Sequence, residues 1–166
     1  MSIIKGQQFP LSRAIWTDKE TSMSGILCAI RGGPSSQPTI AASIRLAKET
    51  SEIIYFLYVV NLDFLTHTSS SKTNHISKEI EEMGEFILLG AQEQAHSQGV
   101  EAESIIRDGK VMDEIITYCE ERRPTYVILG RPQEDQEDNL LTLERLHTFA
   151  ERLEETCQAQ VIYVPE

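Results

Sequence analysis

The feature that most constrains the fold is an unbroken apolar run, Ile53-Ile-Tyr-Phe-Leu-Tyr-Val-Val60. It is rich in β-branched and aromatic residues, and apolar and polar positions do not alternate along it. A strand of this kind is buried on both faces, which is typical of a parallel sheet covered by helices on both sides. The run therefore predicts an α/β protein.

Other apolar strands and amphipathic helices alternate along the chain. Strands are predicted at 26–30, 53–60, 100–106, 126–130 and 161–164. Helices are predicted at 36–50, 76–98, from 111 to just before Pro124, and 143–153, with polar loops at 66–74 and 131–139. Because crossovers between parallel strands are right-handed, this order predicts a single-domain, five-stranded, mostly parallel sheet with helices on both faces.

Residues 1–24 stand apart from this pattern. They contain apolar residues without a sustained period, and Pro10 interrupts any helix there. We therefore expect an N-terminal extension at 1–24 and one domain at 25–166, a length that suits a single core. Trp16 either anchors the extension to the body or to a partner, or belongs to a partly ordered leader.

Composition excludes several classes of function. The net charge is −11, so no broad basic patch is available for nucleic acid or an anionic membrane. No apolar run approaches the ~18 residues of a membrane-spanning helix, and the N-terminus lacks a signal-peptide pattern. The cysteines Cys28, Cys119 and Cys157 form no Cys-x-x-Cys pair, which predicts buried, inert thiols in a reducing cytoplasm. The histidines lack metal-ligand spacing, so no metal site is expected.

Two turns at strand ends are predicted to form the functional site. Gly32 and Gly33 link the first strand to the next helix, and Gly130-Arg131 ends the fourth strand. Ligands of such sheets bind beyond the carboxyl ends of the strands, at the switch in strand order. Free N–H groups at a helix start favour anions, and Arg31 can pair with phosphate or carboxylate. The alternatives are a purely structural glycine turn and an Arg31 paired with the acidic residues of 134–138.

Several collinear segments resemble one known family. Cys28-Ala-Ile-Arg-Gly-Gly33 stands where its members carry a strand ending in Val-Asp-Gly-Ser. Gly99-Val-Glu-Ala-Glu-Ser-Ile-Ile-Arg-Asp-Gly109, Met112-Asp-Glu-Ile115, Tyr126-Val-Ile-Leu-Gly-Arg131, Ala150-Glu-Arg-Leu153 and Val161-Ile-Tyr-Val-Pro165 match the later strands and helices. Over about residues 25–165 the chain resembles the universal stress protein family. The resemblance implies an adenine-nucleotide-hydrolase-like, Rossmann-like fold and a homodimer through the last strand, Val161, Ile162, Tyr163 and Val164.

The resemblance also implies ATP at the carboxyl end of the sheet, but the motif for it is degraded. Members carry Gly-x-x-Gly, then Gly-Ser or Gly-Thr after a spacer, and an aspartate after the first strand. Here Gly130 keeps the first glycine, Gln133 replaces the second, the last pair falls on 147–148, and Arg31 replaces the aspartate. A side chain at Gln133 restricts the backbone, and the acidic 134–138 stretch repels phosphates. We therefore expect weak or absent ATP binding.

The candidate ligand-binding residues are Ile30, Arg31, Gly32, Gly33, Gly130, Arg131 and Thr148. No catalytic residue and no obligatory cofactor are predicted. The favoured function is a non-catalytic, cytoplasmic stress-response or regulatory module that senses a small anionic ligand or acts through protein contacts. A second hypothesis is an enzyme of the ATP pyrophosphatase type, because Arg31–Ser36 resembles the Ser-Gly-Gly-x-Asp-Ser loop of that family. A third is a partner-docking protein with a vestigial cleft, in which extension 1–24 matters more than Arg31.

Overall fold

The computed structural model describes residues 25–65, 69–130 and 143–165. The predicted extension 1–24 and the predicted loop 131–139, which includes Arg131, Gln133 and the acidic 134–138 stretch, lie outside the described residues.

The described residues form one five-stranded parallel sheet with the strand order β3-β2-β1-β4-β5. The strands are β1 (Ile26–Ala29), β2 (Ile54–Val60), β3 (Ala102–Asp108), β4 (Tyr126–Gly130) and β5 (Gln160–Val164). The strand order reverses between β1 and β4, which are direct neighbours with Ala29 opposite Leu129. The predicted five-stranded α/β fold is confirmed.

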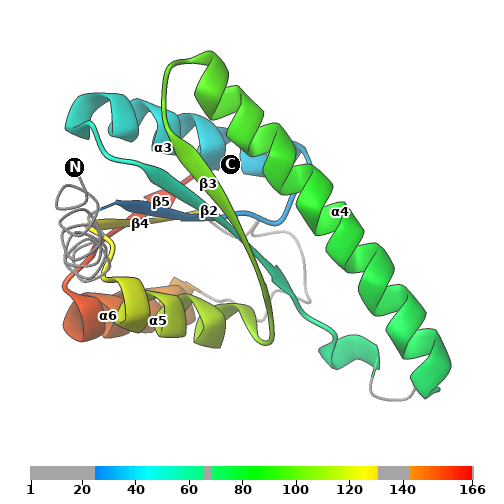
Figure 1. Cartoon of the computed structure of the whole chain (residues 1–166). Helices are drawn as coiled ribbons and strands as arrows, with labels where there is room; N and C mark the ends of the chain where they lie inside the picture. The colour runs from blue at the N-terminus through cyan, green and yellow to red at the C-terminus, as the bar shows by residue number, and fades with distance from the viewer. Residues whose placement is uncertain (1–24, 66–68, 131–142, 166) are drawn as a thin grey trace, which may run out of the picture.

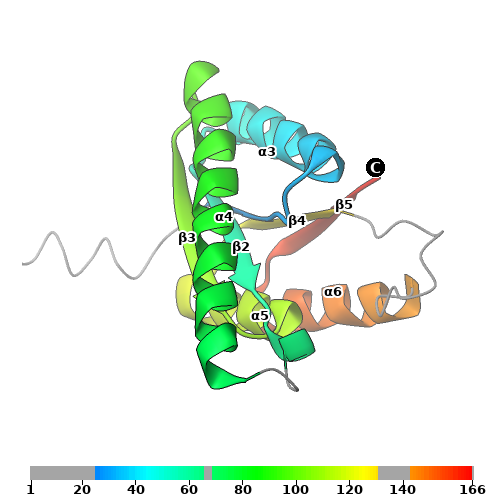
Figure 2. The same cartoon turned by 90° about the vertical axis from the view of Figure 1, so that its right-hand side faces the viewer.

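Helices cover both faces of this sheet (Figures 1 and 2). They are α3 (Gln37–Thr50) and α4 (Ser70–Ser97) on one face, and α5 (Val111–Arg122) and α6 (Leu143–Cys157) on the other. Two short 3-10 turns, η1 (Pro34–Ser36) and η2 (Asp63–Leu65), follow β1 and β2. None of the helices in the described ranges is long and apolar enough to cross a lipid bilayer.

Strand β1 divides the interior into two cores. Ile26 and Cys28 pack with α3 and α4, whereas Leu27 packs with α5 and α6, because successive side chains of a strand point to opposite faces. Each of these side chains is fully buried. A strand that is apolar on both faces is therefore explained by helices on both sides of it.

The N-terminus of α4 differs from the prediction. The polar residues 70–74 were expected to continue the loop, but the helix already begins at Ser70. The Thr73 N–H and hydroxyl both donate to the Ser69 carbonyl, at 2.9 and 3.0 Å, which closes the first turn. Residues 71–74 belong to neither core cluster, so the polar composition of this turn carries no helical apolar period.

Helix α4 approaches the sheet closely at one glycine. A Cβ at Gly84 would lie 2.5 Å from Tyr58 Cδ1, so only glycine lets the helix rest on this ring without a shift. Tyr58 is half-buried in β2 and contacts the core between α3 and α4. The Gly84 contact therefore positions both α4 and the Tyr58 ring.

The edge of the sheet formed by β3 is partly capped. The Glu101 carbonyl accepts a hydrogen bond from Ile54 of β2, so the next carbonyl, at Ala102, points away from β2. The Gln92 side chain of α4 donates to that carbonyl at 2.8 Å and accepts from the Ser104 hydroxyl at 3.0 Å. The Gln92 side chain thus occupies the Ala102 carbonyl, which an additional strand at this edge would need as a hydrogen-bond acceptor.

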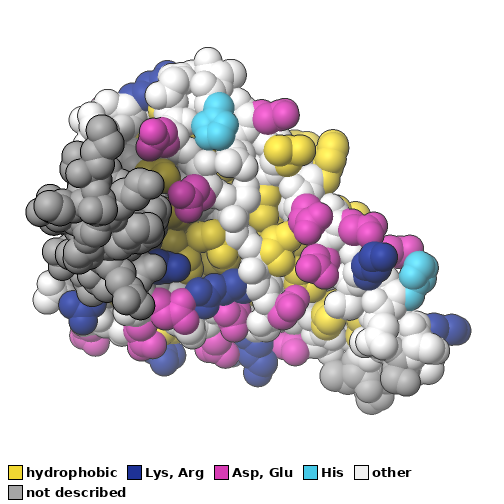
Figure 3. All heavy atoms as spheres, viewed as in Figure 1, with side chains coloured by type: hydrophobic (Ala, Val, Ile, Leu, Met, Phe, Trp, Pro, Cys, Tyr) yellow, Lys and Arg dark blue, Asp and Glu magenta, His cyan; other side chains and the backbone are white. Residues whose placement is uncertain are grey.

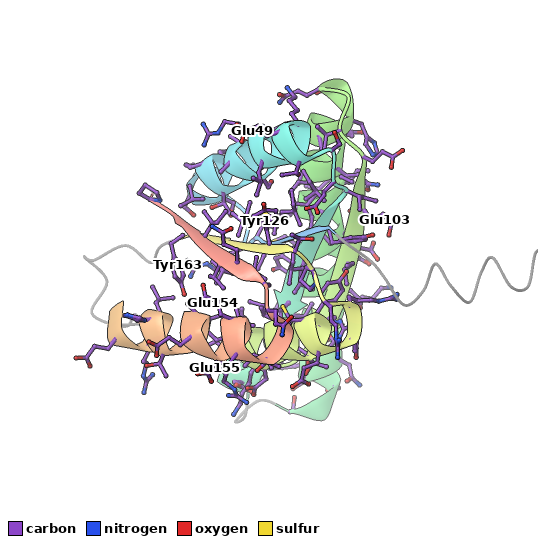
Figure 4. The ribbon with its side chains drawn as sticks, turned by 90° about the vertical axis from the view of Figure 1, so that its left-hand side faces the viewer. Glu49, Glu103, Tyr126, Glu154, Glu155 and Tyr163 are labelled. Carbon is purple, nitrogen blue, oxygen red and sulfur yellow. The ribbon has the colours of Figure 1, made fainter. Side chains whose placement is uncertain are left out.

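Strand β5 forms the opposite edge, and no described element pairs with its outer side. The Gln160 N–H donates to Thr125 at the start of β4, so the backbone of Val161 and Tyr163 faces outward. Figure 4 shows β5 between α3 and α6, with no helix in front of it. All four apolar residues of β5, from Val161 to Val164, are half-exposed.

Candidate functional site

A cavity of about 440 Å³ lies at the carboxyl ends of β1, β2 and β4. It reaches both faces of the sheet, because side chains of α3 and α4 line one part and side chains of α5 and α6 line the other. The ends of β1 and β4 meet at its floor, where the strand order reverses. This is the place where parallel α/β sheets bind ligands.

The described lining is mainly apolar. It includes Ile30, Leu57, Tyr58, Met83, Ile115 and Phe149. The polar side chains in it are Arg31, Ser35, Ser36, Thr39 and Asn61. Arg31, which is exposed, is the charged residue among the described lining residues. An apolar cavity with a few convergent polar groups is typical of a small-molecule site.

The turn after β1 is held by Ser36. The hydroxyl of this buried serine accepts hydrogen bonds from the Gly32 N–H at 3.0 Å and the Arg31 N–H at 3.4 Å, and it donates to the Gly32 carbonyl at 3.2 Å. The sequence led us to expect free amides for an anion in this turn. These two amides instead have a partner within the turn itself.

The start of helix α3 offers few other donors. Pro34 and Pro38 have no N–H. The Ser36 N–H donates to the Gly33 carbonyl at 3.2 Å, and the Gln37 N–H donates to the Pro34 carbonyl. Much of the N–H array that makes a helix start attractive to phosphate is therefore absent or already bonded here.

The structure brings some of the predicted site residues together. Ile30, Arg31 and Gly130 line the cavity, at the adjacent ends of β1 and β4. Gly32 and Gly33 form the turn beside it, with φ values of 87° and 79°, and a Cβ at Gly32 would collide with Ile87 of α4. Arg131 lies outside the described residues.

Thr148 is not brought to the cavity. It is exposed in the second turn of α6, and its hydroxyl donates to the Glu144 carbonyl at 3.0 Å. The backbone N–H of a residue at this place in a helix bonds to the carbonyl four residues earlier. The α6 residues that reach the cavity are Leu146 and Phe149 instead.

Sequence reasoning missed several lining residues. Tyr58 was interpreted as core, and it both contacts the core and lines the cavity. Asn61 comes directly after β2, so the rule that ligands bind beyond strand ends could have found it. Thr39 and Met83 carry no signal of this kind, because their helices place them there only after folding.

The described site contains little catalytic chemistry. Its lining residues include no histidine, cysteine or carboxylate in the described ranges. The nearest thiol, Cys28, is fully buried beneath Thr39, with Sγ 3.9 Å from the Thr39 carbonyl, and burial raises its pKa to about 12. No group of three metal-ligating side chains occurs within the described part of the chain. The burial of Cys28 agrees with the buried thiol that the sequence predicted, and a thiol with so high a pKa is protonated near neutral pH.

A five-stranded parallel sheet with the order β3-β2-β1-β4-β5 and a cavity at the β1–β4 switch defines a Rossmann-like α/β fold. The family described as "Universal stress protein family" matches residues 23–165. The chain belongs to the universal stress protein family, as the resemblance in its sequence indicated.

Known members show how far the likeness extends. Universal stress protein YxiE of Bacillus subtilis is 27% identical over 113 residues, which are 63% of this chain and 76% of that protein. A universal stress protein family structure from Burkholderia pseudomallei superposes with a TM-score of 0.64 at 20% identity, covering 87% of this chain and 97% of that one. An Arabidopsis thaliana member with AMP bound gives a TM-score of 0.55 at 15% identity, covering 86% of this chain and 92% of that one.

Proposed function

We propose that this protein is a non-catalytic regulatory homodimer that binds a nucleoside monophosphate in the cavity and binds ATP weakly or not at all. The observation that carries the proposal is the Ser36 hydroxyl, which occupies amides that would otherwise hold a polyphosphate. The AMP bound to the Arabidopsis relative supports the choice of ligand class. The three buried free cysteines support a reducing, cytoplasmic location.

The described lining of the proposed site has an apolar part and one charged side chain. Tyr58, Met83 and Ile30 offer apolar surface to a nucleobase, and Arg31 offers a guanidinium to one phosphate. ATP has two more phosphates than AMP and so adds about two negative charges. The described lining offers no second cation to bind them, and the protein has a net charge of −11. The turn of Gly32 and Gly33, Gly130 and, from the sequence, Arg131 complete the proposed site.

The cavity favours binding over catalysis. An ATP pyrophosphatase would hold pyrophosphate with the backbone of the Arg31–Ser36 loop. In this chain Ser36 bonds to that backbone from within. The described lining also lacks a carboxylate for Mg²⁺. Both observations support a sensor rather than an adenylating enzyme.

A thermal-shift series with adenosine, AMP, ADP and ATP tests the ligand class. We expect AMP to raise the unfolding temperature most, since saturation at 100 times the dissociation constant stabilises a protein by about 2.7 kcal/mol. Arg31→Gln should reduce the AMP shift to the adenosine value, whereas Arg45→Gln, an exposed arginine of α3 outside the lining, should leave it unchanged. An ATP shift larger than the AMP shift would contradict the proposal.

We propose that the homodimer forms through β5. Its outward-facing backbone and half-exposed Val161, Ile162, Tyr163 and Val164 suit pairing with a second copy. Val161→Pro removes an outward N–H without removing a bond to β4, so we expect light scattering to show half the wild-type mass. Ser104→Pro, the matched change at the β3 edge, should leave the mass unaltered. A Val161→Pro protein that keeps the dimer mass would contradict β5 pairing.

A further inference from the structure

Helix α4 carries an unpartnered apolar surface. Met83, Phe86 and Leu89 have exposed fractions of 59%, 77% and 52%, and they are the large hydrophobic residues that stand exposed in the described part of the chain. They follow one another at intervals of three residues, so they lie on successive turns of the outer side of the helix. We call these three residues the α4 patch; Figure 3 shows hydrophobic side chains among acidic ones over this helix.

The surroundings of the α4 patch are strongly acidic. Between Glu79 and Glu93 the helix has five glutamates and no lysine or arginine. All five glutamates are exposed. Glu79 lies 3.2 Å from His75 and Glu82 lies 3.8 Å from Lys78, but the stretch as a whole keeps an excess of negative charge. A second copy of this helix, equally acidic, would therefore be repelled from the patch, and a basic apolar segment would be attracted to it.

The chain itself contains such a segment. Residues 1–16 include Ile3, Ile4, Phe9, Leu11, Ile15 and Trp16. The same residues include Lys5 and Arg13 but no aspartate or glutamate, although the whole chain has a net charge of −11. Their apolar content matches the α4 patch, and their charge is opposite to that of the glutamates around it.

The attachment point makes this contact easy to reach. The segment joins the fold at Gly25, directly before β1, and β1 pairs with β2, on which α4 rests. The eight residues between this segment and Gly25 span about 28 Å when extended, compared with about 42 Å for the whole of α4. A tether of this length keeps the segment at a millimolar effective concentration near the patch. An unlinked partner has no such advantage.

We propose that residues 1–16 dock on the α4 patch of the same molecule, with Trp16 among the apolar contacts and the basic side chains beside the glutamates of α4. The segment then shields Phe86, the most exposed of the large hydrophobic residues in the described ranges. The α4 patch adjoins the ligand cavity at Met83, which belongs to both, whereas Phe86 and Leu89 are not part of the cavity lining. The proposed contact gives residues 1–24 a function as an intramolecular cover.

Trp16 is the single tryptophan of the chain, so its fluorescence reports on this segment alone. In the full-length protein we expect emission shifted to shorter wavelength than in the urea-unfolded chain, and weaker quenching by acrylamide. Met83→Ser/Phe86→Ser should move both values toward those of the unfolded chain. His96→Ser, an exposed change in the last turn of α4, should move neither.

Emission measured at several protein concentrations distinguishes docking within one molecule from covering of the α4 patch by a second copy. Emission that does not change with protein concentration supports docking within one molecule. Emission that shifts to longer wavelength on dilution would assign the patch to a second copy and overturn the proposal. Emission unaffected by Met83→Ser/Phe86→Ser would overturn it as well, provided that circular dichroism shows the variant to be folded.

Discussion

Gly84→Val is expected to lower the free energy of unfolding by roughly 2–3 kcal/mol, because inserting atoms into a packed contact costs about 1–3 kcal/mol. The new Cβ would lie 2.5 Å from Tyr58 Cδ1 and 2.7 Å from Tyr58 Cε1. The ring or the helix must move, and the ring lines the cavity. Valine gains only a few tenths of a kcal/mol over glycine in helix propensity, which cannot offset the collision.

Gly90→Val is the matched control in the same helix. A Cβ at Gly90 meets no heavy atom within 4 Å, so only the propensity gain remains. We expect urea unfolding to show a small increase in stability for this variant and a large decrease for Gly84→Val. Equal stability of the two variants would mean that the Tyr58 ring turns aside without cost and that the close approach of α4 is not required.

Ser36→Ala is expected to change stability and anion binding in opposite directions. The substitution leaves the N–H groups of Arg31 and Gly32 without the hydroxyl acceptor that now satisfies them. The hydroxyl takes part in three part-buried hydrogen bonds, and a typical hydrogen bond contributes about 0.5–1.5 kcal/mol, so we expect a loss of about 2 kcal/mol in urea unfolding. The same N–H groups become available to a phosphate, so inorganic phosphate should stabilise the variant more than the wild-type protein.

Ser43→Ala is the control for Ser36→Ala. Ser43 is another buried serine, within α3, and its hydroxyl donates to the Ile40 carbonyl of its own helix at 2.7 Å and interacts with the Cys28 thiol, away from the turn after β1. Alanine has the higher helix propensity, so we expect a change smaller than about 1 kcal/mol and no effect of phosphate. A phosphate response as weak in Ser36→Ala as in Ser43→Ala would contradict the assignment of Ser36 as the group that fills the turn.

The sheet could be predicted from sequence because its strands are separate apolar runs. The run at 53–60 and the run at 126–130 coincide with β2 and β4 to within one residue. The start of α4 could not be predicted, because residues 70–74 are polar and residues 71–74 belong to neither core cluster. An apolar period along a helix arises where the helix packs against the core, so these residues show no such period.

The position of the site could also be predicted, but its chemistry could not. Parallel topology alone places Arg31 and Gly130 together. The role of Ser36 depends on the turn bringing its hydroxyl back to amides four and five residues earlier, which no pattern of residue types specifies. Thr148 was predicted to bind the ligand because the last pair of the nucleotide-binding motif falls on residues 147–148. Helix α6 begins at Leu143, so Thr148 lies within the helix, where it is exposed to solvent.

The unequal edges of the sheet determine what kind of assembly this chain can build. If β5 meets its own copy across a two-fold axis, the outer margins of the ten-strand layer are both β3, where Gln92 already holds the Ala102 carbonyl. Such an isologous contact is closed, because each molecule uses its β5 edge to bind the other. No β5 edge then remains to bind a third molecule. The Gln92 side chain, which occupies one outward carbonyl of β3, disfavours further growth into ribbons or fibres at that edge.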